Sequence, residues 1–373
     1  MKIGILGGGQ LARMIIEECY KYGFEFHVLS KDPDSPAGQV TKYETAGEWD
    51  DENCLRKFSE GCDIITLENE FIDPQKIRSL EDRGKKVFPG SKVIGLIQDK
   101  LYQKKTLEKI NIPVAKFCEV NDQKDILNFA KQHGYPVVLK SRTMGYDGKG
   151  NYLINSEKDV ETAFESLSSR GELMCESFVN FDKEIATQVT RSISGEIKVY
   201  PVVETIQKDH ICNFVIASKD QFEKIKLKAE EIAKKVVTEL DYAGTLGIEM
   251  FLTGSDILVN ELAPRVHNSG HYTIEGCYTS QFENHIRAIM NFPLGSTQLR
   301  ENNSVMINII GERNGLSKLQ NAGELLSKEK VYLHVYGKKE TRFGRKMGHI
   351  TVLGDDLSKT IALAKECREA IRI

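Results

Sequence analysis

Three common sequence features are absent from this chain, and each absence narrows its function. The eight cysteines include no C-x-x-C pair and lie mostly among apolar neighbours, so we expect reduced thiols rather than disulfides or a structural metal site. No run of about 18 apolar residues is present, and the stretch Ile3–Leu6 is too short for a signal peptide, so we expect a cytoplasmic protein without a membrane partner. Positive charge is not in excess: the formal net charge is -3, which argues against a general nucleic-acid-binding protein.

The sequence begins with a strand–glycine–helix–strand pattern. Lys2–Leu6 is predicted to be a buried strand, three glycines follow it, and apolar periodicity predicts a helix over 10–22 before a second strand at Phe24–Leu29. The residues that fit the dinucleotide-binding fingerprint of an NAD-dependent oxidoreductase are Gly7, Gly9, Ala12 and Asp32. Any tight turn before a helix can match that fingerprint, so an oxidoreductase is one alternative.

A glycine-rich loop follows a predicted strand in the middle of the chain. The strand 136–140 ends in Lys140, the loop reads SRTMGYDGKGN, and a further strand is predicted at Tyr152–Ile154. Glycines allow backbone N–H groups to turn toward phosphate oxygens, and Lys140 and Lys149 add positive charge. No G-K-[ST] sequence is present and a strand comes next, which excludes a Walker P-loop. The pattern predicts a lid over a nucleotide.

Two carboxylates interrupt an apolar hairpin further along the chain. The strands Ile248–Leu252 and Ile257–Leu262 are separated by a Gly-Ser-Asp segment and contain Glu249 and Glu261. Glutamates in buried strands need partners, and a divalent cation satisfies two at once. With a three-residue loop at 254–256 the two side chains lie directly opposite each other, whereas a two-residue loop would put them on opposite faces. We therefore predict a metal site with Glu249 and Glu261 as ligands.

The remaining patterns predict an α/β protein that continues into an α+β region. The further predicted strands are 64–67, 173–176, 185–189, 197–203, 306–310, 331–335 and 349–353. The further predicted helices are 96–110, 126–133, 222–240, 281–290 and one that begins near 357. Composition changes after Pro89-Gly90, which predicts a first domain boundary near residue 100.

Five motifs are specific as a set. They are LGGGQLARM at 6–14, TLENE at 66–70, GYDGKGN at 145–151, NELAPRVHNSGH at 260–271 and GRKMGH at 344–349. Together with Lys140 and the paired glutamates, these motifs resemble the ATP-grasp superfamily and, within it, the N5-carboxyaminoimidazole ribonucleotide synthetase family. The resemblance implies a Rossmann-like domain at 1–100, an ATP-grasp domain with the glycine-rich lid at 101–293 and a small β-rich C-terminal domain at 294–373.

By this resemblance the chain is a carbon–nitrogen ligase of purine biosynthesis that uses ATP and Mg2+. It would join bicarbonate to 5-aminoimidazole ribonucleotide through carboxyphosphate. The implied ATP contacts are Lys104, Lys140, Gly145, Tyr146, Asp147, Gly148, Lys149, Gly150, Asn151, Glu176, Ser177, Phe178, Val179, Glu184, Gln207, Asn260 and Glu261. The implied substrate contacts are Glu70, Tyr146, Asp147, Arg265, His267, Asn268, Arg345 and either Lys338 or Lys339, with Lys338 preferred. The implied catalytic residues are Asp147, Lys149, Arg265, His267 and Asn268, with Asp147 as the general base.

Three alternatives are weighed against this resemblance. An NAD-dependent oxidoreductase leaves the lid and the paired glutamates without a role. A formate-dependent glycinamide ribonucleotide transformylase would share the superfamily, but APRVHNSGH and GRKMGH favour the imidazole enzyme. A nucleotide-binding regulatory protein would show no turnover of ATP. The family tends to form dimers, so we expect a homodimer whose other partners are small molecules.

Overall fold

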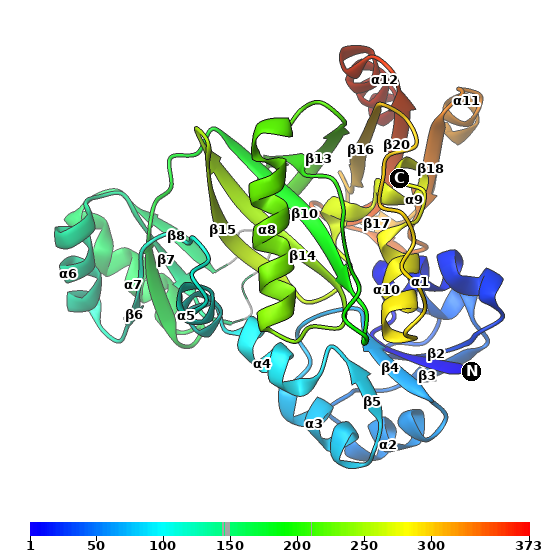
Figure 1. Ribbon diagram of the computed structural model, residues 1–373, viewed down its shortest axis with the longest axis horizontal. Coiled ribbons are helices and arrows are strands. Elements are labelled where there is room, and N and C mark those ends of the chain that lie inside the picture. The colour runs from blue at the N-terminus through cyan, green and yellow to red at the C-terminus, as the bar shows by residue number, and fades with distance from the viewer. Residues whose placement is uncertain (144, 146–149, 210) are drawn as a thin grey trace.

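The computed structural model describes residues 1–143, 145, 150–209 and 211–373, which form three regions in contact (Figure 1). The first region is a five-stranded parallel sheet in the order β3-β2-β1-β4-β5. Its strands are β1 Lys2–Leu6, β2 Glu25–Ser30, β3 Tyr43–Ala46, β4 Ile64–Leu67 and β5 Lys86–Phe88. Its helices are α1 Gln10–Cys19, α2 Glu52–Glu60 and α3 Pro74–Asp82. The predicted βαβ start is present.

Local sequence explains these elements. Strand β1 is almost entirely apolar because a parallel strand is covered on both faces, and only Lys2 in it is exposed. Helices α2 and α3 each begin after an aspartate, Asp51 and Asp73, whose carboxylate accepts backbone N–H groups of the first turn. Pro74 occupies the first turn of α3, where its missing N–H is not needed.

The second region is a four-stranded antiparallel sheet in the order β6-β9-β7-β8. Its elements are β6 Phe117–Val120, α6 Gln123–His133, β7 Val137–Ser141, β8 Asn151–Ile154, α7 Val160–Ser168 and β9 Leu173–Ser177. The prediction of one helix at 96–110 is wrong, because α4 Ser91–Gln98 and α5 Lys100–Lys109 take its place. Asp99 between them has an extended backbone, and its carboxylate accepts the N–H groups of Leu101 and Tyr102, which begins a new helix.

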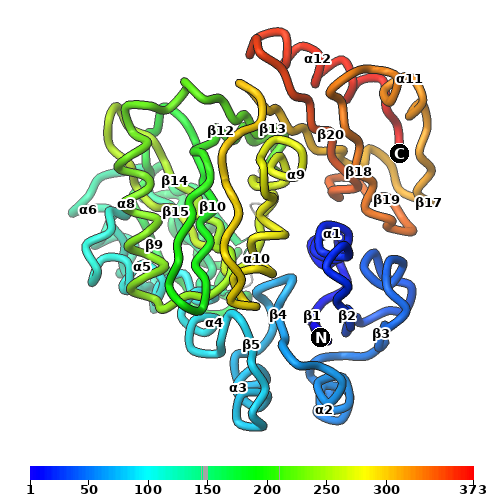
Figure 2. Tube along the Cα trace, turned by 45° about the vertical axis from the view of Figure 1, so that its right-hand side comes forward, coloured from blue at the N-terminus to red at the C-terminus, as the bar shows by residue number. Residues whose placement is uncertain are grey.

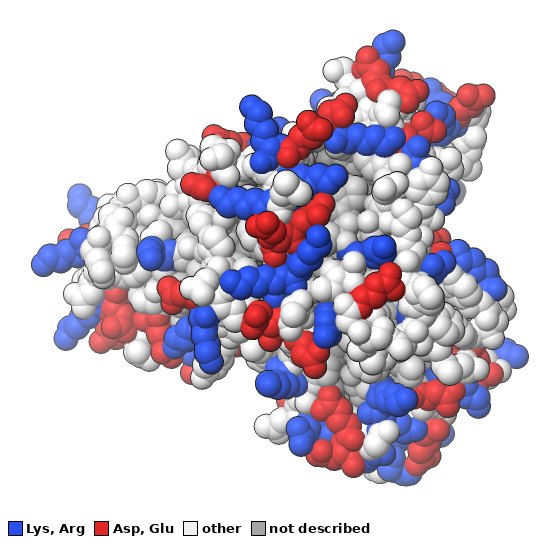
Figure 3. All heavy atoms as spheres, viewed as in Figure 1, with Lys and Arg blue, Asp and Glu red and all other residues white. Residues whose placement is uncertain are grey.

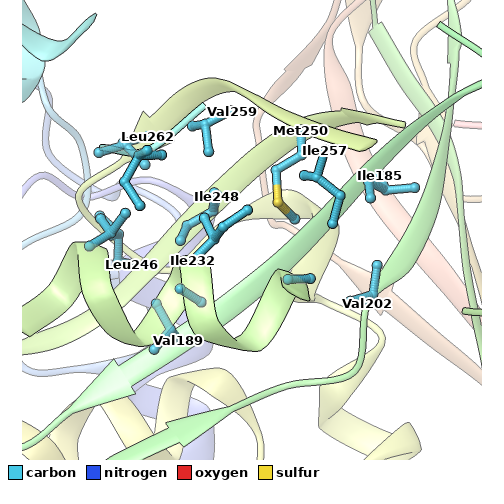
Figure 4. Close-up of a cluster of buried hydrophobic side chains, with 14 of the residues drawn as sticks. Ile185, Val189, Val202, Ile232, Leu246, Ile248, Met250, Ile257, Val259 and Leu262 are labelled. Carbon is cyan, nitrogen blue, oxygen red and sulfur yellow. The ribbon is translucent and has the colours of Figure 1, made fainter. Parts of the chain in front are cut away.

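The largest sheet has nine strands in the order β15-β14-β10-β12-β13-β16-β20-β18, with β11 paired to β10. Its strands are β10 Lys183–Arg191, β11 Ile197–Val199, β12 Val203–Lys208, β13 Ile211–Ser218, β14 Gly244–Thr253, β15 Asp256–Ala263, β16 Asn303–Ile310, β18 Val331–Val335 and β20 Lys346–Gly354. The strand predicted at 197–203 is therefore two strands, β11 and β12. Helix α8 Glu223–Glu239 covers one face, and its Ile232 joins a buried cluster with Leu246 and Met250 of β14 (Figure 4).

The C-terminal strands extend this same sheet. Strand β13 pairs with β16, and β16 pairs with β20. One continuous sheet therefore joins strands from both sides of 293/294, the boundary expected between the ATP-grasp domain and the C-terminal domain. The remaining elements are α9 Thr273–Gly276, α10 Gln281–Ile289, β17 Gly315–Leu316, α11 Ala322–Leu326, β19 Glu340–Thr341 and α12 Leu357–Ala370. Helix α10 lies against α1 (Figure 2) and shares an apolar cluster with it, which joins the first region to the nine-stranded sheet.

The surface carries both signs of charge. On the face drawn in Figure 3, Lys and Arg side chains are interspersed with Asp and Glu, and no extended patch of one sign forms. Within the described part of the chain, no helix has the length and apolar character needed to cross a bilayer.

Candidate active site

A cleft of about 760 Å³ lies where the three regions meet. The first region contributes Gln10, Leu11 and 68–71, and the second contributes Gly145 and Asn151. The nine-stranded sheet and its connections contribute Glu184, Gln207, Cys212, Glu249, Asn260, Glu261, Ala263, Arg265, His267, Asn268, His271, Lys338 and 342–346, and Lys100 comes from α5. Both predicted metal ligands, all the described residues predicted for the substrate and six of those predicted for ATP therefore line one cavity.

The paired glutamates face each other, as predicted, but for a different reason. The loop between β14 and β15 has two residues, because Thr253 pairs with Asp256, so the predicted three-residue loop is wrong. A register shift occurs between the pairs Met250–Val259 and Glu249–Glu261, which leaves Asn260 as an extra residue. This β-bulge restores the register that the short loop would have lost. Glu249 and Glu261 are thus directly opposed and both line the cleft.

The electrostatics around Glu249 suit the binding of a cation. Burial, together with the negative charges of Glu261 and Glu184, raises the pKa of Glu249 to about 7. Asn260 Oδ1 is buried, and no residue in the described part of the chain forms a hydrogen bond with it. Carboxylate and amide oxygens are the ligands that Mg2+ prefers. Among the described residues, no three His, Cys, Asp or Glu side chains form a metal site by themselves, so a cation here would need further oxygen ligands, such as nucleotide phosphates.

Lys100 lines the cleft, although the sequence analysis did not predict it as a site residue. Its ammonium group forms an ion pair with Glu261, and only 12% of its side chain is exposed. It follows Asp99, the residue that begins α5, so the start of that helix directs Lys100 into the cleft. The signal in the sequence was the cap residue Asp99, which the amphipathic pattern of 96–110 obscured. Lys100 gives the cleft a positive charge beside the paired carboxylates.

Lys104 and Lys140, predicted as phosphate ligands, meet at the buried carboxylate of Glu176. Lys104 Nζ lies 2.9 Å from Glu176 Oε2, and Lys140 forms an ion pair with the other oxygen. Although burial opposes ionisation, the Lys140 and Lys104 ammonium groups lower the pKa of Glu176 to about 2. Neither lysine is part of the cleft wall as described, nor are Gly150 and the strand-end residues Ser177, Phe178 and Val179. Glu184, Gln207, Asn151 and Gly145 are part of it.

Arg265 and Glu70 form an ion pair across the cleft. Arg265 Nη2 donates to Glu70 Oε1 at 2.8 Å, and Arg265 Nε bonds the other oxygen, so the pairing is bidentate. Burial opposes ionisation of Glu70, but Arg265 lowers its pKa. His267 lies beside them with Nε2 3.5 Å from Glu249, and burial and Arg265 lower the pKa of His267 well below its usual value. His267 therefore holds its neutral form next to the carboxylate pair.

Asn268 is fixed by a reciprocal amide pair. Asn308 Nδ2 donates to Asn268 Oδ1 at 2.7 Å, and Asn268 Nδ2 donates to Asn308 Oδ1 at 3.1 Å. Both side chains are buried, and Asn308 lies on β16. The pair holds Asn268 at the cleft wall.

A basic segment, 338–346, closes the C-terminal side of the cleft. Arg345 Nη1 donates to the carbonyl of Glu340 at 2.6 Å, and burial together with Arg342 lowers the pKa of Arg345. Lys338 lines the cleft and donates to the carbonyl of Lys346 at 2.6 Å. Lys339 instead turns to Asp34, 3.0 Å away. Of the two lysines considered from the sequence, Lys338 is the one at the cleft.

The predicted lid lies mostly outside the described residues. Tyr146, Asp147, Gly148 and Lys149 are not among them, while Gly145 and Asn151 on either side both line the cleft. The lid contacts and the base assigned to Asp147 therefore stay predictions.

The glycine turn of the first region is filled by a protein carboxylate. Glu68, at the end of β4, accepts the N–H groups of Gly9 at 2.8 Å and Ala12 at 3.3 Å. A Cβ on Gly9 would lie 2.4 Å from Glu68 Oε1, which explains a glycine at this position. The N-terminus of α1, where a dinucleotide would place its pyrophosphate, is thus already neutralised. This argues against the oxidoreductase alternative.

Fold and site define an ATP-grasp protein. The ATP-grasp domain family matches residues 105–282, the ribonucleotide synthetase preATP-grasp domain matches 1–98, and the phosphoribosylaminoimidazole carboxylase C-terminal domain matches 304–363. The chain belongs to the N5-carboxyaminoimidazole ribonucleotide synthetase family, as its relatives establish.

Three relatives illustrate the similarity. The crystal structure of N5-carboxyaminoimidazole ribonucleotide synthetase from Thermotoga maritima is 43% identical, with a TM-score of 0.89 over 100% of this chain and 98% of that one. The synthase from Aspergillus clavatus, in complex with ADP and 5-aminoimidazole ribonucleotide, is 36% identical with a TM-score of 0.90 over 99% and 98%. Phosphoribosylaminoimidazole carboxylase of Schizosaccharomyces pombe is 39% identical over 95% of this chain, which spans 65% of that protein's length.

Proposed function

We propose that this chain carboxylates 5-aminoimidazole ribonucleotide in purine biosynthesis, with ATP and bicarbonate as co-substrates. ATP transfers its γ-phosphoryl group to bicarbonate, and the amine nitrogen then bonds to the carboxyl carbon as phosphate leaves. The products are the N5-carbamate, ADP, phosphate and one proton. The observation that carries this proposal is a single cleft that holds the opposed carboxylates Glu249 and Glu261 together with Arg265, His267 and Lys338.

The nucleotide side of the cleft supplies charge neutralisation. Glu249 and Glu261 would hold Mg2+, which when bound neutralises charge on the transferring phosphoryl group. Lys100 pairs with Glu261 and would move to a phosphate oxygen once a cation takes its place. Lys140 and Lys104 would reach the nucleotide phosphates from Glu176, and Glu184 would hold the ribose. The predicted lid would exclude water, because carboxyphosphate hydrolyses readily.

The substrate side supplies recognition and orientation. Arg265, held by the bidentate contact with Glu70, would stabilise the carboxyphosphate anion. His267 and Asn268 would orient the imidazole and the attacking amine, and their own partners fix both side chains. Lys338 and Arg345 would bind the 5′-phosphate of the ribonucleotide. Asp147 is our choice for the base that accepts the amine proton.

We also propose that the protein is cytoplasmic and that its active form is a homodimer. The family resemblance supports the dimer, and light scattering would test it.

One experiment tests the activity directly. ADP release is measured with bicarbonate and aminoimidazole ribonucleotide each omitted in turn, and the N5-carbamate is trapped as product. Full ADP release is expected only with both substrates. Release that needs formate and glycinamide ribonucleotide would instead indicate the transformylase, and no turnover with any of these would overturn the proposal.

A further inference from the structure

The substrate loop of the proposed site, 337–346, is anchored from two sides. Its second half is tied to the nine-stranded sheet: Gly344 N–H donates to the carbonyl of Gly311 at 3.0 Å, and Gly311 N–H donates to the carbonyl of Arg345 at 2.8 Å. Its first half, which carries Lys338, pairs with β17 at Glu340–Thr341 and in addition contacts the first region. Figures 1 and 2 both place α1 next to the C-terminal strands, where these contacts form.

The first half of the loop rests on Gln39. Gln39 Nε2 donates to the carbonyl of Gly337 at 2.8 Å, across 298 residues of sequence. Its Oε1 accepts from Arg13 Nη1 at 3.1 Å, and Arg13 is itself fixed by the carbonyl of Pro36 at 3.3 Å and by Glu17 at 2.8 Å. The amide of Gln39 is therefore oriented by a charged donor whose own position is determined.

The approach at Gly337 is too close for a side chain. Gly337 has a φ of 72°, and a Cβ there would lie 2.3 Å from Gln39 Oε1 and 2.6 Å from Arg13 Nη1. Because a peptide group is planar, fixing the carbonyl of Gly337 fixes the plane that leads into Lys338. Lys338 Nζ then donates to the carbonyl of Lys346 and lies 5.5 Å from the centre of the Tyr336 ring.

We infer that Gln39 is a positioning residue for the ribonucleotide phosphate. It lies outside the cleft wall and holds the backbone at Gly337, which orients Lys338 toward the phosphate. This inference rests on the proposed function, because it presumes that Lys338 binds the 5′-phosphate. Gln39 touches no reacting group, so its loss should weaken binding of the phosphate without changing the chemical step.

The test uses two substitutions of one residue and a matched control. Gln39→Glu keeps the acceptor for Arg13 but removes the donor to Gly337, and Gln39→Ala removes both. Asp34→Asn is the control, because it breaks only the exposed ion pair with Lys339 in the same interface. Asparagine also suits the positive φ of 57° at position 34.

Each Gln39 variant should raise KM for the ribonucleotide about three- to ten-fold, the effect of losing one hydrogen bond. The inhibition constant of ribose 5-phosphate should rise by the same factor, while kcat, KM for ATP, KM for the nucleoside that lacks the phosphate and the melting temperature stay unchanged. Asp34→Asn should behave as wild type.

An unchanged ribonucleotide KM in Gln39→Glu, or an equal rise in KM for ATP, would overturn the inference. If Arg345→Met raises that KM while Gln39→Glu does not, only the positioning role fails. If Arg345→Met also has no effect, or wild type does not turn over the ribonucleotide, the proposed phosphate site fails and this inference falls with it.

Discussion

Glu249 should destabilise the metal-free protein, and removing its charge should therefore stabilise it. Its pKa is about 7 in the folded protein against an ordinary 4.5, so the folded state binds more protons than the unfolded state between these values. The free energy of unfolding consequently falls as the pH rises from 4.5 to 7. The destabilisation caused by the Glu249 charge is absent below pH 4.5 and complete above pH 7.

The magnitude follows from the two pKa values. A difference of 7 − 4.5 = 2.5 corresponds to about 3 kcal/mol at 25 °C. Because 37% of the Glu249 side chain is exposed, solvent screening reduces this to about 1–2 kcal/mol. Glu249→Gln at pH 8 in EDTA should therefore raise the melting temperature by about 2–6 °C, and at pH 5 most of this gain should vanish.

The assay is thermal unfolding followed by circular dichroism at both pH values, with EDTA or with MgCl2 and ADP. Mg2+ with ADP should stabilise wild type and have a much smaller effect on Glu249→Gln, because a ligand of the cation is lost. Glu70→Gln is the contrasting control: it removes a carboxylate that is paired with Arg265, so it should lower stability at pH 8. A metal-free Glu249→Gln protein that melts below wild type at pH 8 would refute the reasoning.

Three further predictions concern Glu176, Arg345 and the choice of nucleotide. Glu176→Gln leaves Lys104 and Lys140 buried without their anion and should lower the free energy of unfolding by about 3–5 kcal/mol in urea titrations, whereas Glu172→Gln, at a side chain that is 75% exposed, should change little. Arg345→Met should raise KM for the ribonucleotide about ten- to a hundred-fold in steady-state assays and leave KM for ATP unchanged; the reverse pattern would assign this arginine to the nucleotide. MgATP should raise the melting temperature and NAD should not, and stabilisation by NAD alone would revive the oxidoreductase alternative.

Short-range patterns predicted many elements, although β13, α2, α3 and α7 were not among them. Two of the errors occurred where two local signals compete. In the region 96–110 the amphipathic pattern continues through Asp99, yet the capping tendency of that aspartate divides the helix. The carboxylate hairpin is a second case: the opposition of Glu249 and Glu261 was predicted correctly from a loop length that is wrong. A bulge at Asn260 corrects the register, and bulges leave no reliable mark on a single sequence.

Contacts between distant segments could not be predicted from periodicity. Lys100 is an ordinary polar helix residue until the fold brings it to Glu261, 161 positions away. Glu176 was expected only as an ATP contact, and nothing local reveals that its side chain joins Lys104 to Lys140. The family resemblance named about half of the residues that line the cleft, because its motifs come from distant segments that share one site.

The uninterrupted nine-stranded sheet has a consequence for dividing the protein. A fragment that ends at residue 293 would expose the whole edge of β13, and a fragment that begins at 294 would expose the matching edge of β16. The apolar cluster under α12 would also be split, since Phe214 and Ile216 of β13 pack there with Val305 and Ile350. Each piece alone would present a long unpaired strand, a template for aggregation. Produced together, the two pieces should instead recombine through that edge, so the connection 291–302 is a natural place to divide this chain for fragment complementation.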